Sequence, residues 1–110
     1  MKFEYYQDEN GNIPFEDFLE TLPDKDANKF RWMIGVVETL GLEVAKRQKW
    51  TKKLEDNLFE LRSIQGNDIQ RGLFFKYEAG KFVITHGFTK KTDKTPEREK
   101  EKARKIRNLF

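Results

Sequence analysis

The sequence predicts an α+β domain in which helices pack against one mostly antiparallel sheet. Apolar residues recur at helical spacing in the first half of the chain, strand-like segments follow one another with short turns in the second half, and the last predicted element is a charged helix. The predicted element order is β-α-α-β-β-β-α. With 110 residues the chain has the length of one ordinary domain, and we expect a single domain over residues 1–110.

The first half of the chain predicts one strand and two helices. Phe3 and Tyr5 alternate with polar residues, as in a half-buried strand. Pro14 begins a short helix that ends before Pro23. A longer helix then extends to the glycine at position 41.

The longer helix has identifiable ends and one apolar face. Asp24 is its expected N-cap, and Gly41 marks its C-terminal end. Apolar residues at this spacing are typical of a face packed against a sheet, and no cofactor is needed to explain them. We therefore assign to the core Ala27, Phe30, Met33, Ile34, Val37 and Leu40.

The second half of the chain predicts three strands, at residues 58–62, 69–77 and 81–88. Their connections are short and rich in turn residues, which indicates antiparallel hairpins. The segment TPE at 95–97 then begins a charged helix, with its proline at a tolerated early position.

Charge is unevenly distributed along the chain. Residues 1–41 hold four basic and nine acidic residues, for a net charge of −5. Residues 42–89 hold nine and six, for +3, and residues 90–110 hold nine and four, for +5. A basic latter half favours a polyanionic partner, because each cation that meets a phosphate can release condensed counterions. Nucleic acid is the leading partner class, and the alternative is that these charges only solvate the surface.

A basic stretch at residues 46–53 contains one aromatic residue, Trp50. Trp50 either anchors this stretch to the core or stacks on a nucleic-acid base. We favour the anchor.

Several classes of site lack the residues that they need. There is no cysteine, which excludes a disulfide framework, a thiolate metal site and a cysteine nucleophile. His86 is the lone histidine and has no carboxylates at ligand spacing, so we expect neither metal nor cofactor. Ser63, the one serine, lies in no nucleophile-type turn, and a glycine-rich phosphate loop is missing. No apolar run resembles a membrane span or a signal peptide, which predicts a cytoplasmic protein.

The predicted strands contain an unusual set of polar residues, namely Glu60, Arg62, Arg71 and His86. Strand alternation predicts that Arg71 shares a face with Leu73, and that His86 shares a face with Ile84. The loop after the last strand adds three cations, Lys90, Lys91 and Lys94. Loops at the end of a sheet often have functional roles.

These residue types suit metal-free cleavage of RNA. This reaction needs a base for the ribose 2′-hydroxyl, cations for the charge that grows on the phosphate, and an acid for the departing 5′-oxygen. Arg71 and Lys91 are candidates to hold the charge. Candidates to move protons are Glu60, His86 and Lys94. The alternative is that Glu60 and Arg62 form a surface pair and that His86 is a hydrogen-bonded structural imidazole.

Three segments resemble the phage-derived, HigB-like branch of the RelE/ParE toxin superfamily. They are LFELR at 58–62, RGLFF at 71–75 and, most specifically, HGFTKKTDKTP at 86–96. The resemblance covers about residues 54–103. It implies a RelE-like fold and the toxin of a type II toxin–antitoxin system, a metal-independent endoribonuclease that cleaves mRNA in the ribosomal A site. It also implies a cognate antitoxin, commonly a HigA-like protein with a helix-turn-helix domain.

The resemblance also suggests roles for individual residues. Arg71 resembles the strand arginine that contacts the scissile phosphate, and Lys90 or Lys91 resembles the second cation. Glu60 and Arg62 depart from the family, which has lysines on that strand, and no tyrosine follows Tyr77. The acid is then His86 or Lys94.

Two basic segments, 46–53 and 98–107, are expected to dock on ribosomal RNA through its phosphates. The residues assigned to this role are Lys46, Arg47, Lys49, Lys52, Lys53, Arg98 and Arg104. Two other functions stay open. One is a ParE-like toxin that inhibits DNA gyrase without cutting RNA. The other is an inactive relative or DNA-binding regulator whose lysines only contact phosphate.

Overall fold

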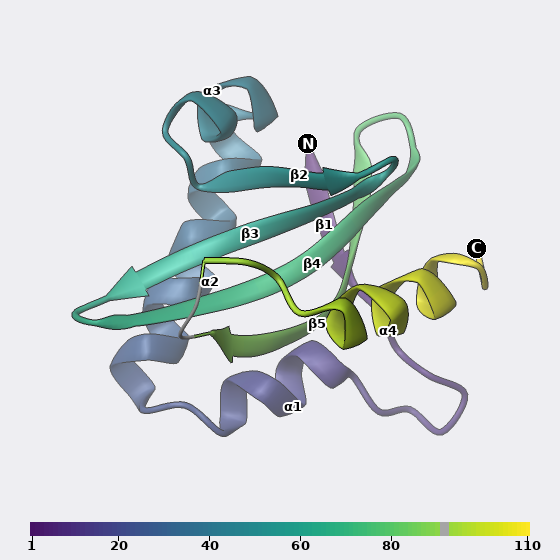
Figure 1. Cartoon of the computed structure of the whole chain (residues 1–110), viewed down its shortest axis with the longest axis horizontal. Coiled ribbons are helices and arrows are strands. Elements are labelled where there is room, and N and C mark those ends of the chain that lie inside the picture. Colours follow the sequence, from purple (N-terminus) through teal and green to yellow (C-terminus); the bar gives the residue numbers. More distant parts are fainter. Residues whose placement is uncertain (91–92) are drawn as a thin grey trace.

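The computed structural model describes residues 1–90 and 93–110. The elements in chain order are β1 (Lys2–Tyr5), α1 (Pro14–Glu20), α2 (Asp24–Leu40), α3 (Leu42–Arg47), β2 (Thr51–Glu55), β3 (Leu58–Gln65), β4 (Asp68–Glu78), β5 (Lys81–Lys90) and α4 (Glu97–Arg107) (Figure 1). The strands form one sheet in the order β1-β5-β4-β3-β2. β1 is parallel to β5, and the other neighbouring strands are antiparallel. The predicted α+β class is confirmed.

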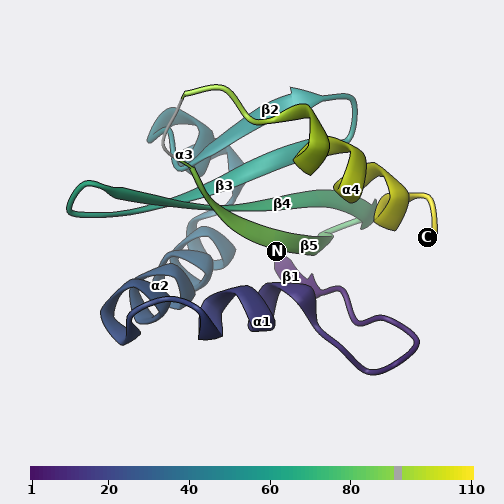
Figure 2. The same ribbon diagram turned by 60° about the horizontal axis from the view of Figure 1, so that its bottom comes forward.

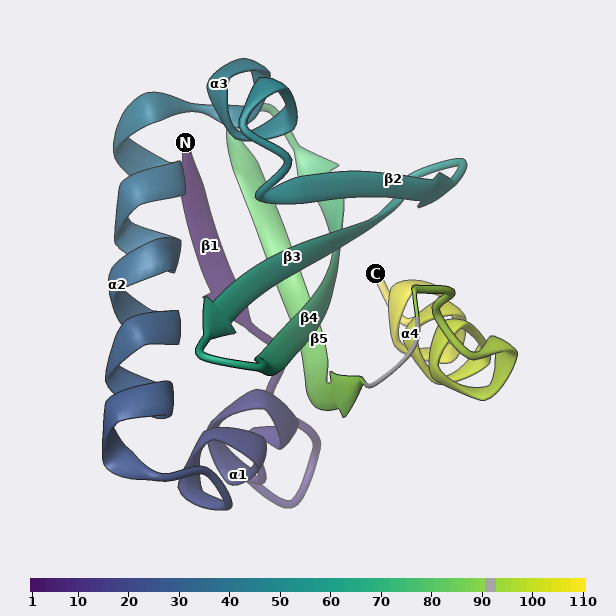
Figure 3. The same ribbon diagram turned by 60° about the vertical axis from the view of Figure 1, so that its left-hand side comes forward.

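Helices cover both faces of the sheet. α1 and α2 lie on one face and α4 lies on the other, as Figures 2 and 3 show. The larger core lies on the α2 face and includes Phe15, Phe30 and Phe74. Two smaller clusters lie under α4, where Ala103 contacts the side chains of Leu58 and Leu73, and Ile106 contacts those of Phe75 and Val83. None of the described helices is long and apolar enough to span a membrane.

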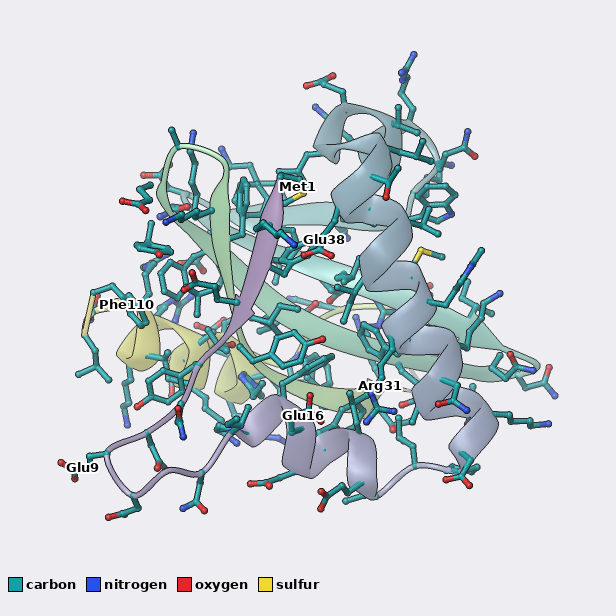
Figure 4. All side chains as sticks on the ribbon, turned by 180° about the vertical axis from the view of Figure 1, so that it is seen from behind. Met1, Glu9, Glu16, Arg31, Glu38 and Phe110 are labelled. Atoms are coloured by element: carbon teal, nitrogen blue, oxygen red, sulfur yellow. The ribbon has the colours of Figure 1, made fainter. Side chains whose placement is uncertain are left out.

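Polar contacts tie α2 to its neighbours. Arg31 of α2 forms an ion pair with Glu16 of α1 at 3.5 Å (Figure 4). Glu38, near the other end of α2, accepts a hydrogen bond from the backbone N–H of Phe3 at 2.8 Å. The edge strand β1 is therefore held both by β5 and by this helix.

The predicted element order lacks two elements, α3 and β2, which overlap the two ends of the basic stretch at 46–53. β2 is an edge strand whose Lys52 and Lys53 are exposed, so it has none of the apolar alternation that predicts a strand. Trp50 lies between α3 and β2, packs in part against the larger core as the anchor interpretation predicts, and with the rest of its side chain lines a hollow at the edge of the sheet.

Two details of α2 differ from the prediction. Pro23, not Asp24, occupies the N-cap position, and no side-chain cap is formed there. Leu40 is 50% exposed, because the helix presents it away from the sheet. Gly41 ends the helix as predicted, with a φ of 89° that favours glycine.

A bulge in β5 changes the face to which His86 belongs. Leu73 pairs with His86 and Phe74 pairs with Ile84, so Thr85 is an extra residue without a partner in the pairing. Ile84 faces the larger core, whereas His86 faces α4. The prediction that His86 and Ile84 share a face is wrong, since the bulge reverses the alternation. Arg71 and Leu73 share a face as predicted, and this is the α4 face.

Two glycines paired across β4 and β5 make room for the aromatic core. Gly72 pairs with Gly87. A Cβ atom at Gly87 would lie 2.3 Å from the ring of Phe18, and one at Gly72 would lie 3.2 Å from the ring of Phe15. α1 therefore approaches the sheet at a place where side chains are missing.

We expect Gly87→Ala to lower the free energy of unfolding by about 1–3 kcal/mol, because the Phe18 ring must move out of an already packed position. Chemical denaturation measures this change. Gly35→Ala is the matched control, since a Cβ there meets no atom within 4 Å, and it should be neutral or stabilise α2 by about 0.5–1 kcal/mol. Equal effects at the two positions would contradict the proposed packing.

Candidate functional site

A buried carboxylate lies at the centre of the polar residues on the α4 face. Glu60 has no exposed surface. Its Oε1 accepts hydrogen bonds from Arg71 Nη1 and, at 3.1 Å, from Arg62 Nε. Its Oε2 accepts a hydrogen bond from the hydroxyl of Thr95. Three separate segments, β3, β4 and the connection before α4, therefore meet at one side chain.

Strand register explains why these residues meet. Glu60 and Arg62 alternate with apolar residues on β3, so both project toward the α4 side. Arg62 pairs directly with Arg71 of β4, which brings two like charges together. Glu60 compensates both of them. Lys52 of β2 pairs with Glu60 and adds another cation at the same level of the sheet.

The Glu60 carboxyl is held in its charged form. Burial alone would raise its pKa, but hydrogen bonds from Thr95 and Arg71, together with the Arg71 charge, lower the pKa below its usual value. A carboxylate with a depressed pKa and three donors is a poor general base near neutral pH. In this structure Glu60 positions Arg62 and Arg71. Arg71 is 3% exposed, and its Nε is buried with no partner among the described residues.

Lys90, at the end of β5, lies close to this network. It is buried, and its Nζ donates a hydrogen bond to the backbone carbonyl of Asp93. Burial lowers the pKa of Lys90, and the nearby charge of Arg71 lowers it further. Lys91, the other predicted phosphate contact, lies outside the described residues.

A basic hollow of about 320 Å³ lies beside the network, between β2 and the segment that leads into α4. We call it the loop-side hollow, and its lining residues are Lys52, Lys53, Leu54, Asp93, Lys94, Thr95 and Lys100. Thr95 joins the hollow to Glu60 through its hydrogen bond. The hollow therefore brings exposed lysines near the buried Arg71, which bonds the same Glu60 carboxylate as Thr95, an arrangement suited to binding phosphate.

His86 is on the same face but has other partners. Its Nδ1 lies 2.9 Å from the hydroxyl of Thr85, and its Nε2 lies 3.2 Å from a carboxylate oxygen of Glu99 on α4. Burial, and then the nearby Lys102 charge, lower its pKa to about 4. The imidazole is therefore neutral at pH 7, and its contacts link β5 to α4.

The predicted docking residues divide into two groups. Lys46, Arg47 and Lys49 are exposed near the end of α3, and Lys52 and Lys53 are exposed on β2. Arg104 differs, because its guanidinium lies between the carboxylates of Glu55, at 2.5 Å, and Glu97, at 2.7 Å. These partners neutralise its charge. Arg98 is exposed and 3.9 Å from Glu99.

The sequence pattern does not predict the roles of three residues. Thr95 belongs to the predicted start of the last helix, whereas Glu99 and Lys100 lie within that helix and have no predicted role of their own. Thr95 lies within the segment of strongest family resemblance, which was a usable signal. Glu99 and Lys100 had no such signal, because their contacts depend on where α4 docks.

Among the described residues, no group of three or more histidine, aspartate and glutamate side chains is arranged to hold a metal ion. The lone His86 has one carboxylate neighbour, Glu99. Binding of an anion by lysines and arginines is the chemistry that these side chains support.

We expect His86 to make stability depend on pH. Its folded-state pKa of about 4 lies below its usual 6.5, so the unfolded chain takes up a proton more readily as the pH falls between these values. A loss of up to about 3 kcal/mol in the free energy of unfolding should develop across this window. Urea unfolding at neutral pH and near pH 4 measures the loss. His86→Gln should show a shallower dependence, and identical slopes would contradict the assignment.

Comparison with protein families gives one match. The model described as phage-derived protein Gp49-like (DUF891) matches residues 17–108. No curated protein matches the chain. The matched region includes α2, all strands except β1, and α4, and it contains the whole Glu60 network. This supports the phage-derived part of the resemblance, whereas placement in the RelE or HigB branch stays a prediction. The chain belongs to the phage-derived Gp49-like family.

Proposed function

We propose that this protein is the toxin of a type II toxin–antitoxin pair and that it cleaves mRNA in the ribosomal A site without a metal. Membership of the Gp49-like family, a toxin-type family, supports the first part. One observation carries the second. Four cations converge around the buried Glu60 carboxylate beside the loop-side hollow, and they are Lys52, Arg62, Arg71 and Lys90.

The proposed reaction is an intramolecular transesterification at one phosphodiester of the RNA. The ribose 2′-oxygen attacks the phosphorus and its proton passes to solvent water, while the bond to the 5′-oxygen breaks and that oxygen takes up a proton from the acid. The products are a 2′,3′-cyclic phosphate and a 5′-hydroxyl. Negative charge grows on the phosphate oxygens in the transition state, and fixed cations stabilise it.

The accessible cations are assigned to the phosphate. Lys52 and Lys94 line the hollow, and Arg62 is partly exposed. Arg71 is buried and does not contact the phosphate directly, but its charge adds to the positive potential at the site. We assign the role of acid to Lys90, because its Nζ bonds the carbonyl of Asp93, which lines the loop-side hollow, and because burial lowers its pKa below the usual value. Glu60 acts as a positioning residue.

The antitoxin partner is expected to place acidic groups over the same hollow, since charge complementarity directs such contacts. The partner expected from the family resemblance is a HigA-like protein with a helix-turn-helix domain. Covering the loop-side hollow would exclude mRNA and neutralise the toxin.

We expect the double variant Lys52→Ala/Lys94→Ala to cleave a defined mRNA on programmed ribosomes about 100-fold more slowly than the native protein, since it removes two phosphate contacts. The sample contains EDTA, and sequencing gels locate the cuts. Lys25→Ala is the control, because it removes a charge on α2, on the other side of the sheet.

Unchanged cleavage by the double variant would contradict the site. If the native protein makes no cuts but inhibits supercoiling by gyrase, it is a gyrase-directed toxin instead. Arg71→Ala is less informative, because removing one partner of a buried ion pair costs about 3–5 kcal/mol and could unfold the protein, although Glu60 keeps Arg62 and Thr95.

The acid role of Lys90 predicts a pH profile. Cleavage should fall as the pH rises through the pKa of Lys90, which lies below its usual 10.5. Lys90→Arg keeps the charge but cannot release its proton, so its rate should be about 100-fold lower and should not fall over this alkaline range. Single-turnover rates measured against pH test this. Thermal unfolding confirms the fold, and the same alkaline decrease in the variant would remove Lys90 from the reaction.

A further inference from the structure

A second hollow lies at the edge of the sheet, apart from the loop-side hollow. It has a volume of about 190 Å³. We call it the Trp50 hollow, and its lining residues are Lys29, Met33, Lys49, Trp50, Arg62 and Ile64. None of its described lining residues is acidic, and three of them are cations.

The fold forms this hollow because β2 is shorter than β3. β2 begins at Thr51, opposite Leu61, so the last residues of β3 extend past the end of β2. The backbone N–H of Arg62 donates a 2.8 Å hydrogen bond to the carbonyl of Trp50, which fixes Trp50 at the corner. Ile64, beyond this point, is 58% exposed.

The residue before Trp50 has an unusual backbone conformation. Lys49 has a φ of 62°, in the left-handed region that non-glycine residues rarely adopt. Strained positions of this kind concentrate at functional sites. Here the left-handed residue reverses the chain after α3, so that Lys49 and Trp50 both line the hollow.

The side chains in the hollow have different partners. Arg62 Nε lies 3.1 Å from Glu60, and Lys29 Nζ lies 4.8 Å from the ring centroid of Trp32. Lys49 is exposed. Trp50 packs against the core in part and also lines the hollow. An aromatic ring beside cations is the arrangement with which proteins bind single-stranded nucleic acid, stacking a base and holding its phosphates.

We propose that the Trp50 hollow binds one base of single-stranded RNA, which stacks on Trp50 while Lys49 and Arg62 contact the adjoining phosphates. Its volume is below the roughly 300 Å³ at which pockets for drug-sized ligands begin, which suits a single ring system. The identity of the strand as RNA rests on the proposed function.

Arg62 connects this subsite to the reaction. Its Nε bonds Glu60, and Glu60 in turn bonds Thr95 of the loop-side hollow. The two hollows are therefore connected through one buried carboxylate. A strand whose scissile phosphate lies at the loop-side hollow would place a neighbouring base at Trp50, which thereby orients the substrate.

The test measures binding separately from cleavage. The probe is a short 2′-O-methyl oligoribonucleotide, which lacks the nucleophilic hydroxyl and cannot be cut. Trp32→Phe provides the parent protein, in which Trp50 is the one remaining tryptophan and reports stacking by fluorescence quenching. A matched oligonucleotide with abasic sites supplies the phosphates without bases.

We expect the probe to quench Trp50 and the abasic strand to bind about tenfold more weakly, near the lower end for one stacked base. In anisotropy measurements with a labelled probe, Trp50→Leu in the same parent should lose the preference for bases. Lys49→Ala, which changes an exposed side chain, should weaken both strands and reduce the salt dependence. Thermal unfolding confirms that each variant is folded.

Equal affinity for the base-bearing and abasic strands would overturn the proposal, as would an unchanged preference in folded Trp50→Leu. If ribosomal mRNA is cut while the probe does not quench Trp50, the subsite is wrong and the proposed function stands. If the probe binds as expected while no mRNA is cut, the subsite stands and the proposed cleavage is wrong.

Discussion

The buried Glu60 carboxylate is the interaction on which the polar half of this protein depends. Taking a charge out of water costs several kcal/mol unless partners compensate it. Glu60 is compensated by Arg62, Arg71 and the hydroxyl of Thr95. These partners come from two strands and from the segment before α4. The carboxylate thus holds two arginines that would otherwise repel each other, and it fastens the connection to α4 onto the sheet.

The two faces of the sheet have different physical roles. On the α2 face, paired glycines let aromatic rings approach the strands, and an apolar core fills the space between helices and sheet. On the α4 face the apolar contacts form two small clusters, and polar residues occupy the space between them and the sheet's end. The bulge at Thr85 contributes to this difference between the faces, because it turns His86 away from the aromatic core and toward Glu99.

The net charge does not show how the basic residues are distributed, because some are paired with carboxylates and others line hollows. Arg104 is neutralised by two carboxylates, so part of the positive charge of α4 stabilises the docking of that helix. Seven other cations among the described residues line the two hollows, three in the Trp50 hollow and four in the loop-side hollow, and hydrogen bonds through Glu60 connect the two. Lys52 and Lys94 belong to one hollow, whereas Lys49 and Arg62 belong to the other. This arrangement suits an extended polyanion better than a single small anion.

The α+β class, the three long strands and the limits of most helices can be predicted from local patterns, because they depend on hydrophobic periodicity and on the positions of proline and glycine. The sequence also identified Glu60, Arg62 and Arg71, since charged residues in apolar strands are conspicuous. The contacts that these three residues make depend on how the strands and α4 pack together. α3 is short and packs on the core through Leu42 and Ala45, β2 is an edge strand without apolar alternation, and the Thr85 bulge reverses a face that strict alternation assigns otherwise. The contacts of Glu60 with Thr95 and of His86 with Glu99 join residues 35 and 13 positions apart. Such contacts depend on where α4 docks, which is a property of the packed chain and not of any local pattern.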